Sequence, residues 1–306
     1  MKYILTFLII FIIGVCAMCD NMFDIPQRDK KEVKTVAHRG NSKFCPENTL
    51  TAYKSAVKLG ADIVETDVHI TKDGIPVFSH DGSIDRCSNG KGLIAEKTLD
   101  ELKGYNFGCT TNPAFGDRYK NEPILTVEDG IKFFKEANVG YFLEIKTPAV
   151  IVPTAEIIKK LKPNKTKTMF LVWNNNDSRA IKKVLKGYNI YHLDPINDFI
   201  TAEDKEAYFK ELKDAGITGF SINHSVLFGG AAYNLTKEDR DVFLVLAAKY
   251  KMPVGVWTID TTSEMNYAIN YQVKGVINKK TYIGKIDLIT TNDPAKCILL
   301  TGKNLK

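Results

Sequence analysis

The sequence predicts an α/β protein whose parallel strands close into a TIM (β/α)8 barrel, with a small insertion after an early strand. Its 306 residues, less an N-terminal leader, suit one such barrel, which commonly takes about 250 residues and tolerates insertions. Short apolar runs alternate with amphipathic helical stretches, and repeated strand–helix units form parallel strands with right-handed crossovers. A doubly wound open sheet is the alternative, but no glycine-rich dinucleotide loop follows a predicted strand.

Residues 1–21 are typical of a signal peptide. Lys2 supplies a positive charge, residues 4–15 are an uninterrupted apolar run, and Val15-Cys16-Ala17 resembles a cleavage site with small residues. The apolar run is shorter than the roughly 20 residues of a membrane-spanning helix. We therefore expect export, either as a secreted or periplasmic protein or, with Cys19 lipidated, as a protein tethered to a membrane through its N-terminus.

The remaining chain is predicted to be a linker at 22–31 and one domain at 32–306. Its composition limits the kinds of ligand that the domain is expected to bind. The formal net charge is +6, but the lysines are scattered, which does not indicate a nucleic-acid-binding surface. No motif points to an obligatory protein partner. We expect buried free thiols among the cysteines of the domain, with a Cys87–Cys109 disulfide as the alternative.

The first part of the domain is predicted to supply three strands and a helix. An apolar strand at 33–37 leads through a loop to a helix at 48–59, which Gly60 closes. A second strand follows at 62–70 and a third, short one at 76–79. Side chains alternate along a strand, so every second residue of 62–70 lies on the same face.

These strands and their ends carry charged and titratable residues that can act together on one substrate. Glu65 and Asp67 share one face of a strand and can bind a hard divalent cation, which prefers oxygen ligands. His38 and His80 can exchange protons near neutral pH, and Arg39 offers a planar fork to a phosphate. A cation, two proton-transfer groups and a phosphate-binding fork are what hydrolysis of a phosphodiester requires.

The same stretch resembles the glycerophosphodiester phosphodiesterases through five motifs: His38-Arg39-Gly40, Pro46-Glu47-Asn48-Thr49, Glu65-Thr66-Asp67-Val68, Thr71-Lys72-Asp73-Gly74 and His80-Asp81. This resemblance implies metal-dependent hydrolysis of glycerophosphodiesters to glycerol 3-phosphate and an alcohol. It implies His38 as general base and His80 as general acid, although the roles are exchangeable. Attack by water and attack by a hydroxyl of the substrate, through a cyclic phosphate, both stay open.

The middle of the chain is predicted to complete the charged set. Residues 82–123 are rich in turn signals and read as an insertion, which in the related family roofs the substrate pocket. A strand at 140–146 follows, and its alternation puts Glu144 and Lys146 on one face at its C-terminal end, where barrel enzymes carry their active sites. The resemblance makes Glu144 the third metal-binding carboxylate and Lys146 a phosphate-binding residue. All three ligands are then carboxylates, which predicts one divalent cation, Ca²⁺ or Mg²⁺.

Strands and helices alternate regularly beyond this point. Strands are predicted at 168–173, 189–193, 219–222 and 254–259, with a last pair at 275–277 and 288–291; the helices are predicted at 178–185, 204–215, 236–250 and 263–270. The resemblance places Trp257 in the pocket against the glycerol portion of a substrate. The segment Leu171-Val172-Trp173 departs from the Gln-Ser-Phe of many relatives, so the alcohol preferred by the pocket stays open.

Two other functions compete with this interpretation. A lysophospholipase D or sphingomyelinase-D-like enzyme uses a similar set of two histidines and three carboxylates, and would need an exposed apolar entrance. An exported binding protein without catalysis is the other alternative. Degenerate members of such families usually lose a histidine or a metal-binding carboxylate, whereas this sequence keeps them all.

Overall fold

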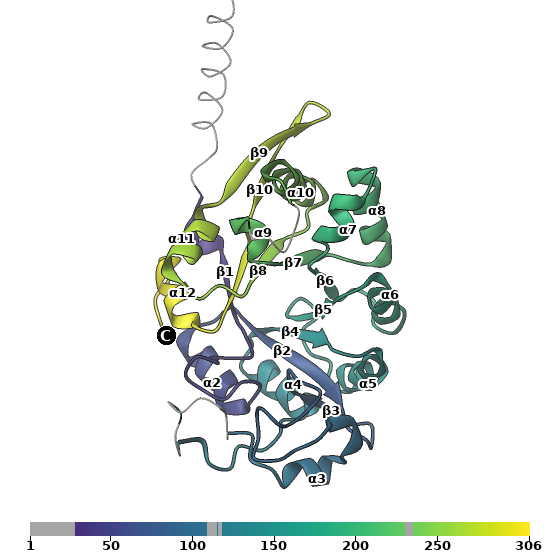
Figure 1. Ribbon diagram of the computed structural model, residues 1–306, viewed down its shortest axis with the longest axis vertical. Coiled ribbons are helices and arrows are strands. Elements are labelled where there is room, and N and C mark those ends of the chain that lie inside the picture. Colours follow the sequence, from purple (N-terminus) through teal and green to yellow (C-terminus); the bar gives the residue numbers. More distant parts are fainter. Residues whose placement is uncertain (1–27, 109–114, 116–117, 230–234) are drawn as a thin grey trace, which may run out of the picture.

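The structure is a computed structural model that describes residues 28–108, 115, 118–229 and 235–306. The predicted signal peptide, Cys19 and Cys109 lie outside these residues. The predicted barrel is confirmed: within the described residues, eight parallel strands form one sheet that closes because β1 pairs with both β2 and β11 (Figure 1). These strands are β1 (Lys34–Ala37), β2 (Ile63–Ile70), β4 (Gly140–Ile145), β5 (Thr168–Val172), β6 (Asn189–Leu193), β7 (Gly219–Asn223), β8 (Val254–Trp257) and β11 (Leu288–Thr291).

Helices cover the outside of the barrel (Figure 1). The longer ones are α2 (Leu50–Leu59), α4 (Val127–Glu136), α5 (Ile151–Leu161), α6 (Asn175–Val184), α8 (Lys205–Ala215), α10 (Lys237–Tyr250), α11 (Thr262–Asn270) and α12 (Pro294–Leu300). Short helices at α7 (Ile196–Thr201), α9 (Ser225–Phe228), η1 (Lys30–Glu32) and η4 (Pro148–Val150) complete this layer. In the part of the chain that the structure describes, no helix has both the length and the apolar character needed to cross a membrane.

The barrel interior is apolar at one end and charged at the other. Ile63 on β2 and Phe142 on β4 belong to a buried cluster inside the barrel. Because side chains alternate, Glu65, Asp67 and Glu144 point to the same interior, but nearer the C-terminal ends of these two strands. The intervening residues of both strands pack outward against the helices.

Helix α2 begins two residues later than the sequence predicts. Thr49 is its N-cap and accepts a hydrogen bond from the Ala52 amide, while Gly60 ends the helix with φ +98° as expected. Asn48 has φ +57° and therefore cannot be helical. Its side-chain amide instead donates a hydrogen bond to Asp67 over 2.8 Å.

Two predicted strands lie outside the barrel. Strand β3 (Pro76–Phe78) is not a barrel strand, because β2 continues past the barrel and β3 folds back on it in antiparallel pairing. The expected pair at 275–277 and 288–291 is also wrong. Strand β9 (Gln272–Ile277) pairs instead with β10 (Lys280–Lys285), through a turn at Asn278 and Lys279 with positive φ, while β11 is a barrel strand.

The insertion contains the 3-10 helix η2 (Ile94–Glu96) and the short helix α3 (Leu99–Lys103), and it has an apolar core of its own. Ile84, Ile94, Leu102 and Phe107 form a buried cluster with Val77 of β3. A capping box at Thr98 and Glu101 begins α3. The described part of the insertion is thus packed against the end of the β2–β3 hairpin.

Gly130→Ala tests how α4 packs on β3, because a Cβ atom at residue 130 would clash with the Phe78 ring of β3. Replacing a helical glycine by alanine usually stabilises by about 0.4–1 kcal/mol, whereas overpacking costs about 1–3 kcal/mol. We expect the free energy of unfolding, measured by denaturant titration, to fall by about 1–3 kcal/mol. Glu136→Ala, at an exposed position of the same helix, is the control and should change it by under about 0.5 kcal/mol. An unchanged or raised stability of Gly130→Ala would contradict the packing of α4 on β3.

Candidate active site

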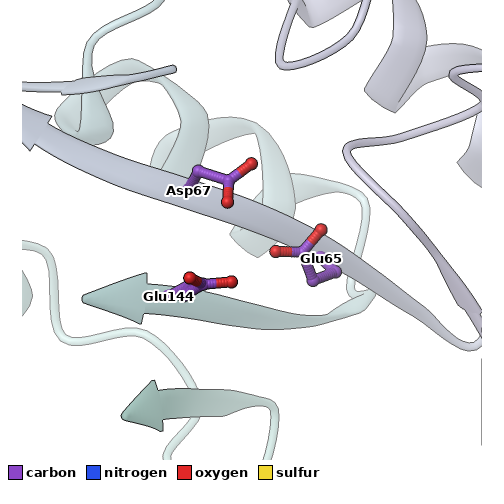
Figure 2. Close-up of side chains that lie close together, drawn as sticks. All are labelled: Glu65, Asp67 and Glu144. Carbon is purple, nitrogen blue, oxygen red and sulfur yellow. The ribbon is translucent and has the colours of Figure 1, made fainter. Parts of the chain in front are cut away.

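Three carboxylates meet inside the charged end of the barrel. Glu65 and Asp67 lie on β2, Glu144 lies on the adjacent β4, and Asp67 is directly opposite Glu144 in the strand register. Figure 2 shows the three side chains pointing toward one common space. All three are buried, and each offers an oxygen within 4.8 Å of an oxygen of the other two. Two neighbouring strands of one parallel sheet thus bring together the three carboxylates that the sequence predicted as metal ligands.

Two cations flank this carboxylate cluster. The Lys146 ammonium lies 2.6 Å from Glu144 Oε1 and 3.0 Å from Asp67 Oδ1. The Arg39 guanidinium lies 3.4 Å from Asp67 Oδ2, and the Arg39 backbone amide donates to Glu65 over 2.9 Å. When all five groups are ionised, they carry three negative charges and two positive charges.

The pKa values of Asp67 and Glu65 shift in opposite directions. Burial alone would raise the pKa of Asp67, but the charges of Lys146 and Arg39 outweigh it and hold that pKa well below its usual range. Burial, together with repulsion from Asp67 and Glu144, raises the pKa of Glu65 well above its usual range. Glu65 is therefore the group that gains most if a further cation enters the cluster.

His38 follows β1 and is held by Asn292, which follows β11. Its Nδ1 lies 2.7 Å from Asn292 Oδ1, while the Asn292 amide nitrogen donates to Asp260. A carboxylate only accepts hydrogen bonds, so the amide oxygen of Asn292 faces His38 and Nδ1 carries the hydrogen. Burial and the neighbouring Arg39 lower the pKa of His38 to about 4. At neutral pH the ring is uncharged, with its lone pair on Nε2.

His80 follows β3 and is held by the next residue. Its Nδ1 lies 2.7 Å from Oδ1 of Asp81. Hydrogen bonds from Arg86 and His80 outweigh partial burial and lower the pKa of Asp81 to about 2, so Asp81 is an anion at neutral pH. An anionic acceptor fixes the ring of a histidine and stabilises the positive charge that the ring takes up during proton exchange.

A cavity of about 170 Å³ joins these groups. Seven of the eight predicted site residues line it: His38, Arg39, Glu65, His80, Glu144, Lys146 and Trp257. The eighth, Asp67, is buried and contacts Arg39 and Lys146 of this lining. Leu171, Trp173 and Leu193 form an apolar part of the wall, so the segment that departs from its relatives does border the cavity.

The sequence indicated the supporting residues less well. Asn48 was named only as part of a motif and Asn292 was not singled out, although the first bonds Asp67 and the second bonds His38. In the insertion, Asp85 accepts a hydrogen bond from the Gly92 amide, and Asn89 accepts one from the Asn106 amide, 17 positions away. Arg86 bonds both Asp81 and Glu47. Long-range contacts of this kind leave no periodic signal in a sequence.

The cysteines add nothing to the site in the described part of the chain. Cys45, Cys87 and Cys297 are buried free thiols there. Burial raises the pKa of Cys87 to about 12, which makes this thiol a poor nucleophile. The expectation of free thiols is confirmed for these three, and the alternative pairing involves Cys109, which the structure does not describe.

The barrel and the cavity define a class of protein, a hydrolase of phosphate esters: cationic side chains stand beside converging carboxylates at the C-terminal ends of the strands. The sequence model of the glycerophosphoryl diester phosphodiesterase family matches residues 38–281. The chain belongs to this family of glycerophosphodiester-hydrolysing enzymes.

Individual relatives agree with this assignment. The chain is 34% identical over 180 residues to a glycerophosphodiester phosphodiesterase of Caldanaerobacter subterraneus subsp. tengcongensis, a match that covers 56% of this chain and 72% of that protein. It is 37% identical over 121 residues to a glycerophosphodiester phosphodiesterase of Bacillus subtilis, which covers 38% of this chain and 41% of the relative. The match to the second enzyme thus spans less than half of its length.

Solved structures resemble the fold over most of the chain. An Oleispira antarctica phosphodiesterase, solved in complex with the product sn-glycerol-3-phosphate, superposes with a TM-score of 0.66 at 24% identity, covering 88% of this chain and 97% of that one. A putative glycerophosphoryl diester phosphodiesterase from Silicibacter pomeroyi superposes with a TM-score of 0.71 at 14% identity, covering 92% and 97%. These likenesses support the barrel.

The environment of His38 predicts a pH dependence of stability in the metal-free protein. The pKa of His38 is about 4 when folded, against an ordinary value of 6.5, so the unfolded chain binds more protons between these values. Stability should fall as the pH falls through this window. The cavity keeps His38 in some contact with solvent, so we expect this group to contribute about 1–3 kcal/mol of the fall.

The measurement compares the wild type with His38→Gln, in EDTA, by denaturant titration from pH 7 to pH 4. The difference between the two free energies of unfolding isolates this one residue from the many carboxyl groups that also titrate. A difference that stays constant across the window would contradict the lowered pKa of His38. An NMR titration of the ring provides the independent check.

Proposed function

We propose that Glu65, Asp67 and Glu144 bind one divalent cation and that the protein hydrolyses glycerophosphodiesters to glycerol 3-phosphate and an alcohol around it. Three buried oxygen donors within 4.8 Å of one another fit a hard cation, and burial, together with repulsion from Asp67 and Glu144, raises the pKa of Glu65. A bound Ca²⁺ or Mg²⁺ would supply charge stabilisation to the non-bridging phosphate oxygens. The convergence of these carboxylates in the same cavity as two histidines is the observation that carries the proposal.

We assign the general base to His38. It is uncharged at neutral pH, and its bond to Asn292 leaves the Nε2 lone pair to take a proton from the attacking oxygen. That oxygen belongs to water or to a neighbouring hydroxyl of the substrate. We assign the general acid to His80, because the Asp81 anion supports the charged ring that donates a proton to the leaving alkoxide.

The remaining residues orient the substrate in this proposal. Arg39 and Lys146 present positive charge to the phosphate, the first as a planar fork and the second as a point charge. Trp257 packs against the glycerol portion; its indole nitrogen donates to the Ser221 carbonyl, which fixes the ring. Trp173 lies edge-to-face with Trp257 at a ring distance of 6.0 Å and borders the alcohol side.

The roles of the two histidines are tested with two leaving groups, choline and p-nitrophenolate, each esterified to glycerol phosphate. Choline leaves as a strongly basic alkoxide and needs a proton, whereas nitrophenolate leaves without one. We expect His80→Asn to lower kcat about 10²–10⁴-fold on glycerophosphocholine but under about 10-fold on the nitrophenyl ester. His38→Asn should lower kcat on both substrates. Released glycerol 3-phosphate and nitrophenolate are measured.

His224→Asn is the control for this experiment. It replaces a histidine by asparagine as the other two variants do, but outside the cavity lining, and should leave both rates near wild type. Full turnover by His38→Asn or His80→Asn would contradict the proposed chemistry. If His38→Asn is the variant that loses activity on glycerophosphocholine alone, the roles of the two histidines are exchanged. Lysophosphatidylcholine is included as a third substrate, and a faster rate on it than on glycerophosphocholine would favour the lysophospholipase D alternative.

Glu65→Gln tests the cation site without relying on catalysis. Glutamine keeps the shape and the acceptor for the Arg39 amide but removes one charge from the cluster. We expect the variant in EDTA to be at least as stable as the wild type, because a repulsive buried charge is gone. The increase in melting temperature that Ca²⁺ or Mg²⁺ gives the wild type should disappear. Glu136→Gln, at an exposed position, is the control and should keep the increase in melting temperature. If the increase also persists in Glu65→Gln, the ion binds elsewhere.

A further inference from the structure

Arg86 of the insertion connects two parts of the site that the strands bring close but do not join. Its Nε donates to Asp81 Oδ2 over 2.7 Å. Its two terminal nitrogens donate to the two oxygens of Glu47, each over 2.8 Å. All three nitrogens of one guanidinium are therefore used, in the planar geometry that fits carboxylates best.

Each of these carboxylates holds a residue of the site. Asp81 accepts from His80 Nδ1 over 2.7 Å through its other oxygen. Glu47 accepts from Arg39 Nη1 over 3.0 Å, and Arg39 in turn faces Asp67. An unbroken series of hydrogen bonds thus runs from His80 through Arg86 to the residue that flanks the carboxylate cluster.

The backbone around Arg86 is itself fixed. Ile84 is fully buried in the apolar core of the insertion, its amide donates to Gly92, and its carbonyl accepts from the Ser88 amide. Cys87, the next residue after Arg86, is also buried. The side chain of Arg86 is 39% exposed, but that of Glu47 is only 17% exposed. An ordinary solvated surface pair has neither this anchored backbone nor two carboxylates already committed to other site residues.

We propose that Arg86 is a positioning residue that holds His80 and Arg39 in their working places by linking Asp81 to Glu47. The arm through Asp81 orients the ring of His80, and the arm through Glu47 orients the fork of Arg39. The folded insertion is thereby a structural requirement for activity as well as a neighbour of the pocket. This inference rests on the proposed roles of His80 as acid and Arg39 as phosphate fork.

The arm to His80 is tested with Arg86→Gln and the same two esters. Misplacing a group that orients a reacting side chain commonly costs about 10–100-fold in activity. We expect kcat on glycerophosphocholine to fall by that factor and kcat on the nitrophenyl ester to fall under about 3-fold, because only the first needs the acid. Lys91→Gln, which removes an exposed cation of the same insertion, is the matched control and should behave as wild type.

The arm to Arg39 is tested with Glu47→Gln, which removes the carboxylate that accepts from both Arg39 and Arg86 and leaves Asp81 bonded to Arg86. We expect KM to rise by a similar factor for both esters, which share the phosphate, with no selectivity for the leaving group in kcat. Arg86→Lys is the second variant if Arg86→Gln does not fold. One ammonium cannot span Asp81 and Glu47 as the guanidinium does, so the same selectivity in kcat is expected.

An equal loss of kcat on both esters in Arg86→Gln, or wild-type kcat on both, would overturn the positioning role. Melting temperatures identify a loss that comes from unfolding alone, which also counts against it. His80→Asn, run in parallel, separates this inference from the proposed function. If His80→Asn is selective and Arg86→Gln is not, the role of Arg86 alone fails; if His80→Asn is not selective either, the acid role of His80 fails with it.

Discussion

The repulsion among three buried carboxylates is the constraint on which the rest of the site depends. Glu65, Asp67 and Glu144 are brought together by two adjacent strands, and burial together with this repulsion raises the pKa of Glu65. Burying such charge is costly unless it is paired, so the fold must surround the cluster with cations. Lys146 and Arg39 meet part of this need and at the same time become groups suited to a phosphate. In the proposed function, the charges that are costly to bury are also the ones that bind the cation and the phosphate.

The barrel tolerates the cost of burying these charges because its apolar core and its charged residues lie at different ends of its axis. Apolar residues such as Ile63 and Phe142 fill the interior toward one end, and the alternate residues pack outward against helices. The charged residues occupy the C-terminal ends of the strands, where loops supply their partners. His38 is held from the loop after β11 and His80 from the segment after β3. The two histidines consequently have different surroundings, an amide for one and a carboxylate for the other, which supports different roles.

The parts of this arrangement that follow from periodicity could be predicted from the sequence. Alternation along β2 and β4 correctly put Glu65, Asp67, Glu144 and Lys146 on interior faces. Features set by contacts between distant residues could not be predicted in this way. Strand β3 lies outside the barrel because β2 is long enough to pair beyond it. Arg86 lies among turn residues, and only the folded chain shows that it meets Glu47, 39 positions earlier. Export and lipidation concern residues that the structure does not describe, and they stay predictions.

The most direct test of the account is to locate the ion. Crystals of the protein grown with Mn²⁺ and glycerol 3-phosphate would show it by anomalous diffraction. The account predicts one anomalous peak, with oxygens of Glu65, Asp67 and Glu144 at about 2.0–2.6 Å from it and the phosphate between the ion and the two histidines. A peak bound by other residues, or no peak in crystals of a protein that EDTA inactivates, would contradict it.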